Sequence, residues 1–185
     1  MPRDSNGIIL TTDRLKFRQL RESDLDALVQ INTDPEVMKF IGKGGAKSPE
    51  QTHDELRWIL KLYETRGYGL WGTILRENGR LIGRCGLIPW TIEDVDELEV
   101  AYLLAREYWG QGFATEAASA IIDYAFTQYS CDHLISLIYP DNTASIRVAE
   151  KAGMHRHKEV YLFGSDILMY RILRKDWERK SSSDR

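Results

Sequence analysis

Strand-like and helix-like hydrophobic patterns alternate along this chain of 185 residues. Apolar residues at every second position indicate a strand, whereas apolar residues three to four apart indicate the buried face of a helix. The first strand is predicted at residues 15–20, and three helical segments follow it within residues 23–67. This interleaving favours an α/β or α+β sheet domain over a helical bundle or a β-sandwich.

Each of the three helical segments begins at a capping signal. Ser23 precedes the first run of apolar residues at helical spacing, as a helix N-cap does. Asp34–Pro35 suits a second helix start, because proline is tolerated in the first turn, and the glycine-rich residues 42–45 end that segment. Ser48–Pro49 starts a third helix, which is expected to close at Gly67.

The middle of the chain predicts a hairpin. Residues 70–75 and 81–88 have the composition of strands and flank Asn78–Gly79, a strong short hairpin signal because both residues tolerate positive φ. Residues 89–96 are expected to form a loop, and residues 97–104, which alternate, the next strand.

The last third of the chain predicts two helices and three strands. A helix at residues 114–128 carries small apolar residues on one face, which allow close packing on a sheet. A strand at residues 133–139 precedes a helix at residues 143–152, which Gly153 closes with a left-handed cap. The final strands are expected near residues 158–163 and 167–174.

Composition fits one ordinary soluble domain with a substantial core, since 43% of the residues are hydrophobic and 29% are charged. We expect a single domain over residues 8–180, with flexible termini at residues 1–7 and 181–185. The formal charge of −3 gives no global electrostatic reason to expect nucleic acid as a partner.

Several classes of protein do not fit the chain. No apolar run approaches about 18 residues and no hydrophobic leader is visible, so we expect a cytoplasmic protein with no membrane partner. Cys85 and Cys131 lie far apart without metal-ligand spacing, which indicates free thiols and no bound metal. For Cys85 we expect a packed core thiol. Both a monomer and a homodimer stay open.

Residues 109–116, WGQGFATE, carry the most informative chemistry. They lie between a predicted strand and the start of a helix, where Gly110 and Gly112 let backbone N–H groups approach an anion and the helix dipole favours negative charge. A phosphate or pyrophosphate fits such a turn. A tight strand-to-helix turn without any ligand is the alternative.

Two further landmarks surround this turn at fixed spacing. Residues 142–153 match the pattern NxxSxxxxEKxG, and residues 109–117 match WGxGxAxEA. With the opening residues 12–18, these segments resemble the Gcn5-related N-acetyltransferases (GNAT), most closely the ribosomal-protein (RimJ/RimL-like) branch. The resemblance spans roughly residues 12 to 174. The wider family begins the turn with Gln or Arg where this chain has Trp109, so backbone donors would bind the phosphates.

The resemblance implies a fold and a cosubstrate. The fold would be an α+β domain with a mixed, mostly antiparallel sheet, helices on both faces, and two parallel, diverging strands at residues 97–104 and 133–139. Acetyl-CoA would lie between those strands and satisfy their unpaired backbone groups like an added strand. The implied binding residues are Leu103, Leu104, Ala105, Trp109, Gly110, Gln111, Gly112, Phe113, Ala114, Thr115, Asn142 and Ser145.

Acetyl transfer to nitrogen needs a neutral amine and a stabilised leaving group. The resemblance makes Glu99 the first candidate for the general base and Ser145 a donor to the departing thiolate. The alternative for Glu97 and Glu99 is a pair of solvated edge charges, and Glu159 is a weaker substitute base. For Asn142 and Ser145 the alternative is a role in helix capping alone.

The implied activity is acetyl transfer from acetyl-CoA to a primary amine by direct attack in a ternary complex. The acceptor would be a protein N-terminal amine or a small molecule, chosen by residues 32–66 and 89–96, which carry no readable motif. The glycine-rich loop at residues 42–45 is expected to border the acceptor pocket. The aromatic residues form either an acceptor cleft or core; they are Trp58, Trp71, Trp90, Tyr63 and Tyr68. A catalytically silent acyl-CoA sensor and a phosphate enzyme that does not use CoA are the competing readings.

Overall fold

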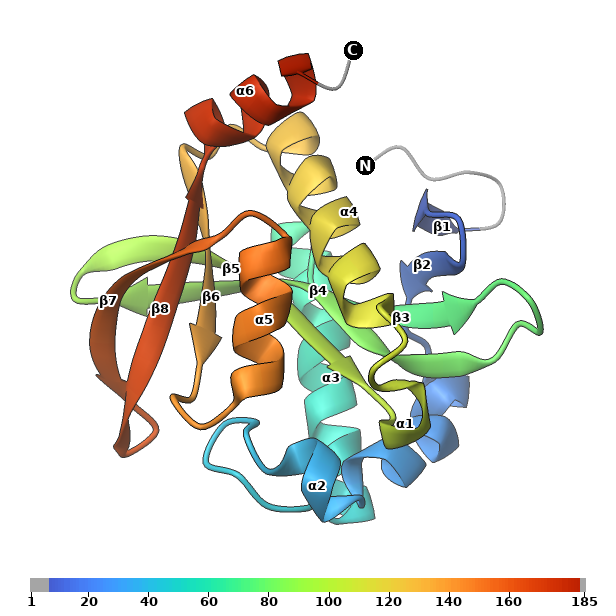
Figure 1. Ribbon diagram of the computed structural model, residues 1–185. Helices are drawn as coiled ribbons and strands as arrows, with labels where there is room; N and C mark the ends of the chain where they lie inside the picture. The colour runs from blue at the N-terminus through green and yellow to red at the C-terminus, as the bar shows by residue number, and fades with distance from the viewer. Residues whose placement is uncertain (1–6, 184–185) are drawn as a thin grey trace.

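The computed structural model describes residues 7–183, which form a single sheet covered by helices on both faces (Figure 1). Within these residues the sheet has eight strands in the order β1-β2-β3-β4-β5-β6-β8-β7. Their bounds are β1 Ile8–Thr11, β2 Leu15–Gln19, β3 Leu70–Leu75, β4 Leu81–Ile92, β5 Val95–Leu104, β6 His133–Ile138, β7 His155–Leu162 and β8 Ser165–Leu173.

The helices divide between the two faces of the sheet, with α4 and α5 in front of it in Figure 1 and α3 behind it. Only β5 and β6 are parallel; the other neighbouring strands of residues 7–183 run antiparallel. This confirms the expected mixed, mostly antiparallel α+β fold. The helical bounds are α1 Leu25–Asn32, α2 Pro35–Met38, α3 Pro49–Arg66, α4 Phe113–Gln128, α5 Thr143–Lys151 and α6 Arg174–Ser183, with 3-10 turns at Glu22–Asp24 and Arg106–Tyr108.

Capping residues set most helix ends as predicted. Ser48 Oγ accepts a hydrogen bond from Gln51 N, and Gln51 Oε1 accepts one from Ser48 N, which is the capping box that begins α3. Gly67 closes the same helix at a φ of +75°. Ser23 is not a cap, because it lies inside a 3-10 turn and Asp24 precedes α1.

The loop predicted at residues 89–96 is wrong, because β4 continues to Ile92 and β5 begins at Val95. A two-residue turn joins the strands, with Glu93 and Asp94 at φ of +50° and +63°. Pro89 fits this long strand because β3 ends opposite Gly86, so at Pro89 β4 has β5 as its only sheet neighbour.

Both ends of the chain differ from expectation. Strand β1 precedes the strand at 15–20, while residues 1–6 lie outside the described part. At the other end, α6 follows β8 and includes residues 181–183, where a polar, frayed terminus is expected from composition. Arg174 explains this helix start, since its guanidinium donates to the carbonyls of Phe126, Tyr129 and Cys131 at the end of α4.

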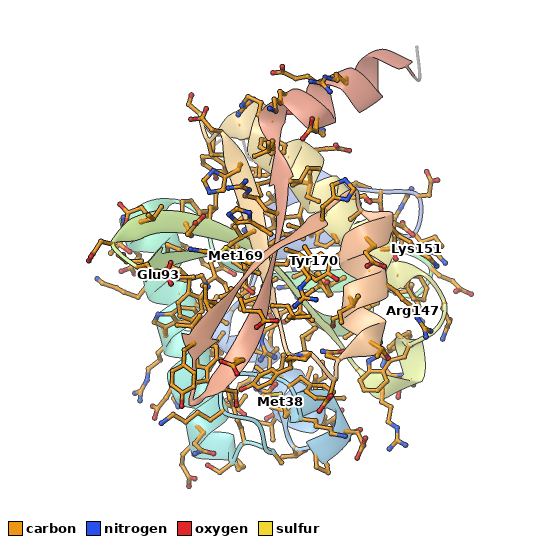
Figure 2. The ribbon with its side chains drawn as sticks, turned by 60° about the vertical axis from the view of Figure 1, so that its left-hand side comes forward. Met38, Glu93, Arg147, Lys151, Met169 and Tyr170 are labelled. Atoms are coloured by element: carbon orange, nitrogen blue, oxygen red, sulfur yellow. The ribbon has the colours of Figure 1, made fainter. Side chains whose placement is uncertain are left out.

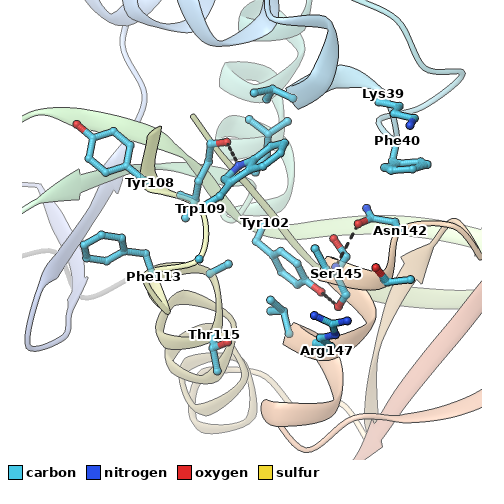
Figure 3. A pocket seen from close by; sticks show the side chains of 18 of the residues that line it. Lys39, Phe40, Tyr102, Tyr108, Trp109, Phe113, Thr115, Asn142, Ser145 and Arg147 are labelled. Carbon is cyan, nitrogen blue, oxygen red and sulfur yellow. Dashed lines mark hydrogen bonds between the residues drawn. The ribbon is translucent and has the colours of Figure 1, made fainter. Parts of the chain in front are cut away.

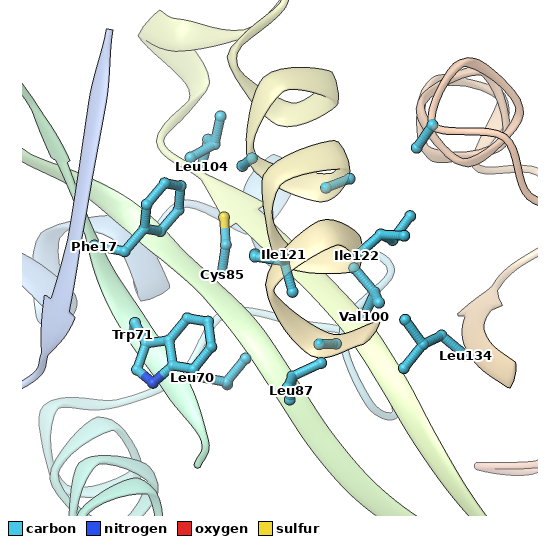
Figure 4. Close-up of a cluster of buried hydrophobic side chains, with 14 of the residues drawn as sticks. Phe17, Leu70, Trp71, Cys85, Leu87, Val100, Leu104, Ile121, Ile122 and Leu134 are labelled. Atoms are coloured by element: carbon cyan, nitrogen blue, oxygen red, sulfur yellow. The ribbon is translucent and has the colours of Figure 1, made fainter. Parts of the chain in front are cut away.

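The core lies between the central strands and α4 (Figure 4). Ile121 and Ile122 of α4 pack on Leu87 of β4 and Val100 of β5. Cys85 is fully buried among them, and burial raises the pKa of its thiol to about 11. The prediction of a packed core thiol is therefore confirmed.

Tyr63 of α3 joins the helix layer to the sheet through its hydroxyl. Tyr63 Oη accepts a hydrogen bond from Leu20 N at 3.1 Å and donates one to Leu70 O, and all three residues are buried. We expect Tyr63→Phe to lower the free energy of unfolding by roughly 1–3 kcal/mol, because two buried backbone groups lose their partner. Urea denaturation measures this, and an unchanged midpoint would contradict it.

Candidate active site

The site forms where β5 and β6 separate. Their paired register consists of Glu99 and Ile135 alone. Beyond this pair, side chains replace the ladder: Ser136 Oγ donates to Val100 O at 2.7 Å, and Leu137 N donates to Glu99 Oε1 at 3.3 Å. The rest of β5 up to Leu104 therefore lies open on its β6 side, with backbone groups available to another partner.

A cavity of about 460 Å³, here called the glycine-turn cavity, occupies this opening (Figure 3). The end of β5, the turn before α4, the first turn of α5 and the segment after α2 form its walls. Ten predicted binding residues line it: Leu103, Leu104, Trp109, Gly110, Gly112, Phe113, Ala114, Thr115, Asn142 and Ser145.

The other two predicted binding residues, Ala105 and Gln111, do not line the glycine-turn cavity. Ala105 packs against the apolar cluster that includes Val37 and Leu103. Gln111 turns away, because its Nε2 donates to Glu107 O at 2.8 Å and its carbonyl accepts from Arg14 at 2.9 Å. The closure of the turn sets where these two residues lie, and residue spacing along the chain does not reveal it.

The glycine turn has the left-handed geometry that an anion-binding turn needs. Gly110 and Gly112 adopt φ of +72° and +82°, and Gly112 is the N-cap of α4. No atom outside the turn lies within 4 Å of a Cβ built at Gly110, so the backbone there is open. The first turn of α4 is anchored from behind, since Arg14 Nε lies 2.6 Å from Glu116 Oε2.

Trp109 closes the same turn back onto the sheet. Its indole Nε1 donates to Leu104 O at 2.9 Å, and its side chain is 47% exposed. The side chain therefore acts as a brace between the turn and β5 (Figure 3). With the indole N–H engaged, backbone N–H groups are the donors that the turn still offers, and these are the donors that the resemblance implies for phosphate binding.

Two positive residues of this cavity, Arg147 and Lys151, were not predicted from the sequence. Arg147 and Lys151 come from successive turns of α5 (Figure 2), and Lys39 follows α2. The spacing of four between Arg147 and Lys151 places them on one helix face, so helical periodicity was the available signal. Together they give the cavity three cations.

Asn142 and Ser145 stand at the start of α5. Asn142 Oδ1 accepts from Ser145 N at 3.1 Å, so the capping role is present, and both residues also line the cavity. Tyr102 Oη donates to Ser145 O at 2.9 Å (Figure 3). Tyr102 was missed by the sequence reasoning, and burial raises the pKa of its hydroxyl.

A second cavity of about 240 Å³, here called the Glu99 cavity, adjoins the first. The two share the residues Phe40, Ile41, Tyr102 and Leu103 as walls. Side chains alternate between the two faces of β5, so Glu99 and Leu103 lie on one face and Val100 and Tyr102 on the other. Separation of β5 from β6 thus brings cavities from both faces of the sheet together.

Glu99 is buried, with only 8% of its surface exposed, which overturns the reading of this residue as a solvated edge charge. Trp90 Nε1 donates to Glu99 Oε2 at 2.6 Å, and Leu137 N donates to the other oxygen. Burial raises the pKa of Glu99 to about 7, although both hydrogen bonds oppose the shift. A carboxylate with such a pKa can exchange a proton near neutral pH.

The other two carboxylates have different settings. Glu97 Oε2 lies 2.6 Å from His133 Nε2, so it is paired with an imidazole. Glu159 is exposed on β7, pairs with Arg156 and lines neither cavity. Geometry therefore favours Glu99 over Glu159.

The pKa of Glu99 makes a prediction about stability. A folded pKa of about 7 against an ordinary 4.5 means that stability is lost as pH rises between these values, because the folded state resists ionisation. We expect the free energy of unfolding of Glu99→Gln, measured by urea denaturation, to exceed that of the wild type by about 3 kcal/mol at pH 8, with most of this difference gone at pH 5. A gap independent of pH would contradict the buried acid.

The aromatic residues divide between cleft and core. Trp58 and Trp90 line the Glu99 cavity, whereas Trp71 and Tyr63 are buried in the main core and Tyr68 packs against it. The glycine-rich loop does border this cavity, as expected, through Gly42, whose carbonyl accepts from Tyr139 Oη at 2.6 Å.

Within residues 7–183 no helix has the length and apolarity to cross a bilayer. The same residues contain no cluster of three or more His, Cys, Asp or Glu side chains arranged to hold a metal ion.

Comparisons with known proteins agree with this geometry. Residues 14–155 match the model of the acetyltransferase (GNAT) domain. The uncharacterized protein YkkB of Bacillus subtilis is 36% identical over 93% of this chain and 95% of its own length. A crystal structure of an acetyltransferase from Agrobacterium tumefaciens has a TM-score of 0.76 at 29% identity, covering 88% of this chain and 92% of its own. The ribosomal L7/L12 acetyltransferase RimL, in complex with coenzyme A, shares the fold at a TM-score of 0.71 and 19% identity, covering 90% of this chain and 97% of its own.

Proposed function

The chain belongs to the GNAT acetyltransferase family, and from this membership we propose that it transfers the acetyl group of acetyl-CoA to a primary amine. In this proposal the glycine-turn cavity binds acetyl-CoA and the Glu99 cavity binds the amine. The acceptor is a small-molecule amine or the N-terminal amine of a protein.

The residues of the glycine-turn cavity fit acetyl-CoA. Open left-handed glycines at the N-terminus of a 16-residue helix suit a pyrophosphate. Lys39, Arg147 and Lys151 complement the remaining phosphate charge. The open side of β5 offers backbone groups to the amides of the pantetheine arm. RimL, whose structure contains coenzyme A, has the same fold.

Acetyl-CoA supplies an acetyl thioester. The amine nitrogen attacks the thioester carbonyl carbon, a C–N bond forms, and the C–S bond breaks. Glu99 accepts the proton that the nitrogen loses, directly or through a water molecule. Ser145 Oγ hydrogen-bonds to the sulfur as thiolate develops, and the thiolate then takes a proton from solvent. The products are the N-acetylated amine and CoA.

One observation carries this proposal: Glu99 and Ser145 line separate cavities that meet where β5 leaves β6. Direct transfer in a ternary complex requires a base beside the amine and a hydrogen-bond donor beside the departing thiolate. Proximity in a shared opening, rather than either residue alone, supports acyl transfer.

The test combines binding with turnover. Acetyl-CoA is titrated by calorimetry in parallel with ATP, and free thiol release is then measured with primary amines against a control without amine. We expect acetyl-CoA to bind more tightly than ATP and thiol to appear only with an amine. Binding without release under any amine would favour an acyl-CoA sensor, and ATP binding at least as tightly would favour a different phosphate ligand.

A further inference from the structure

Phe163 lines the Glu99 cavity from a backbone conformation that bulky residues rarely adopt. It stands in the turn between β7 and β8 at a φ of +58°, and Gly164 follows at +85°. Left-handed backbone is disfavoured for a residue with a large side chain, and such residues concentrate where function requires a side chain at one place.

The strained turn presents the phenyl ring to Trp90. The two ring centroids lie 5.7 Å apart at an interplanar angle of 72°, an edge-to-face contact, and both rings line the Glu99 cavity. Trp90 in turn donates its indole N–H to Glu99. Phe163 therefore contacts the residue that holds the candidate base.

A second contact fixes the position of this hairpin. Lys158 Nζ of β7 pairs with Glu93, the first residue of the β4–β5 turn. An ion pair thereby joins the tip of the β4–β5 hairpin to β7, and a ring contact joins the tip of the β7–β8 hairpin to Trp90 of β4. The aromatic wall of the cavity is a built feature rather than a chance approach of loops.

The opposite walls are also aromatic. Trp58 of α3 lines the cavity with 44% of its surface exposed, and Phe40 and Tyr139 meet with ring centroids 5.9 Å apart. Aliphatic residues also line the cavity; they are Ile88, Leu137 and Ile167. A planar apolar group would find ring faces and edges on several sides.

The charged side chains of the Glu99 cavity offer few carboxylates to a polycation. Glu55 is shared by two cations, with Lys47 Nζ at 2.7 Å and Arg84 at 3.0 Å, and Arg84 also donates to Asn32 Oδ1. Glu99 is the one further carboxylate in the lining of the Glu99 cavity, as far as residues 7–183 are concerned. One amino group can meet Glu99, whereas additional ammonium groups would face Lys47 and Arg84.

We propose that the acceptor is an aromatic monoamine, whose amino group meets Glu99 while its planar apolar body contacts Trp90, Phe163 and Trp58. This inference rests on the proposed function and narrows it. Phe163 is then a residue that selects the acceptor. The volume of about 240 Å³ is small for a ligand pocket, which favours a small molecule over a long peptide.

The experiment compares kcat/KM for four acceptors by thiol release: 2-phenylethylamine, n-butylamine, spermidine and kanamycin. We expect 2-phenylethylamine to exceed spermidine and kanamycin by about tenfold or more, an energy difference that burial of one aromatic ring readily supplies. Preference for spermidine or kanamycin would overturn the proposal. A result in which none of the four amines is acetylated would also overturn it. The titration with acetyl-CoA then decides whether the proposed function fails as well.

Phe163→Gly isolates the ring. Glycine adopts a φ of +58° freely, so the variant relieves the backbone while deleting the phenyl group. We expect kcat/KM for 2-phenylethylamine to fall about tenfold, mainly through KM, with n-butylamine changed less than about threefold and acetyl-CoA affinity unchanged. Tyr161→Ala, at a 72% exposed aromatic on β7, is the matched control and should leave both amines unaffected. An equal loss with both amines in Phe163→Gly would refute selection by the ring.

Discussion

Glu99→Gln is expected to lower kcat by about 100- to 1,000-fold, the usual contribution of a positioned general base. The amide has the same shape as the acid and can keep one acceptor for Trp90 or Leu137, but it cannot take a proton from the attacking amine. The affinity for acetyl-CoA should stay the same, because Glu99 lines only the neighbouring cavity. Steady-state kinetics and calorimetry on the same preparations measure both quantities.

The pH dependence of kcat tests the role of Glu99 independently. The base must be ionised to act, so wild-type kcat should fall about tenfold for each pH unit below the pKa of about 7. Glu99→Gln should lose this limb of the profile. Glu159→Gln, an exposed and ion-paired carboxylate on β7, is the matched control and should behave as the wild type. A profile that survives in Glu99→Gln would assign the base elsewhere.

Gly110→Asp is expected to weaken acetyl-CoA binding by about 100-fold or more. A carboxylate about 4 Å from a phosphate oxygen costs roughly 1 kcal/mol in bulk water and about 4 kcal/mol near a protein surface, and 2.7 kcal/mol corresponds to 100-fold in Kd. The fold should tolerate the change, because a Cβ at Gly110 meets no other atom within 4 Å and Asp accepts left-handed backbone better than most residues.

Gly110→Asn separates charge from shape. Asn has the same size as Asp and the same tolerance of positive φ, so its effect on Kd should stay below about tenfold. Both variants should unfold at the same temperature as the wild type. Equal weakening by Asp and Asn would mean that the turn needs glycine for space and that no phosphate lies beside Gly110.

Local signals made much of the fold predictable. The bounds of α3 follow from Ser48–Pro49 at one end and Gly67 at the other, because caps act over a few residues. Strand β3 matches the run with strand composition at residues 70–75, which is also a local signal. The glycine turn was equally visible, since positive φ selects glycine at Gly110 and Gly112.

Features set by tertiary contacts were not predictable. Pro89 reads as a loop residue, yet it lies in a strand because β3 ends before it. Glu93–Asp94 forms a tight turn without the glycine that usually marks one. Trp90 carries no sign of its bond to Glu99, nine residues away across a hairpin. Arg147 and Lys151 were visible as a pair at helical spacing, but not the cavity that they face.

The single register pair between β5 and β6 divides the sheet into two hydrogen-bonded ladders, β1 to β5 and β6 to β7. The hydrogen bonds of each ladder can open without breaking those of the other, so we expect the two ladders to behave as separate units in amide hydrogen exchange. A molecule bound to the open side of β5 and to the start of α5 bridges those units. Its binding energy then appears as slower exchange in β6 and β8, at amides that it does not touch.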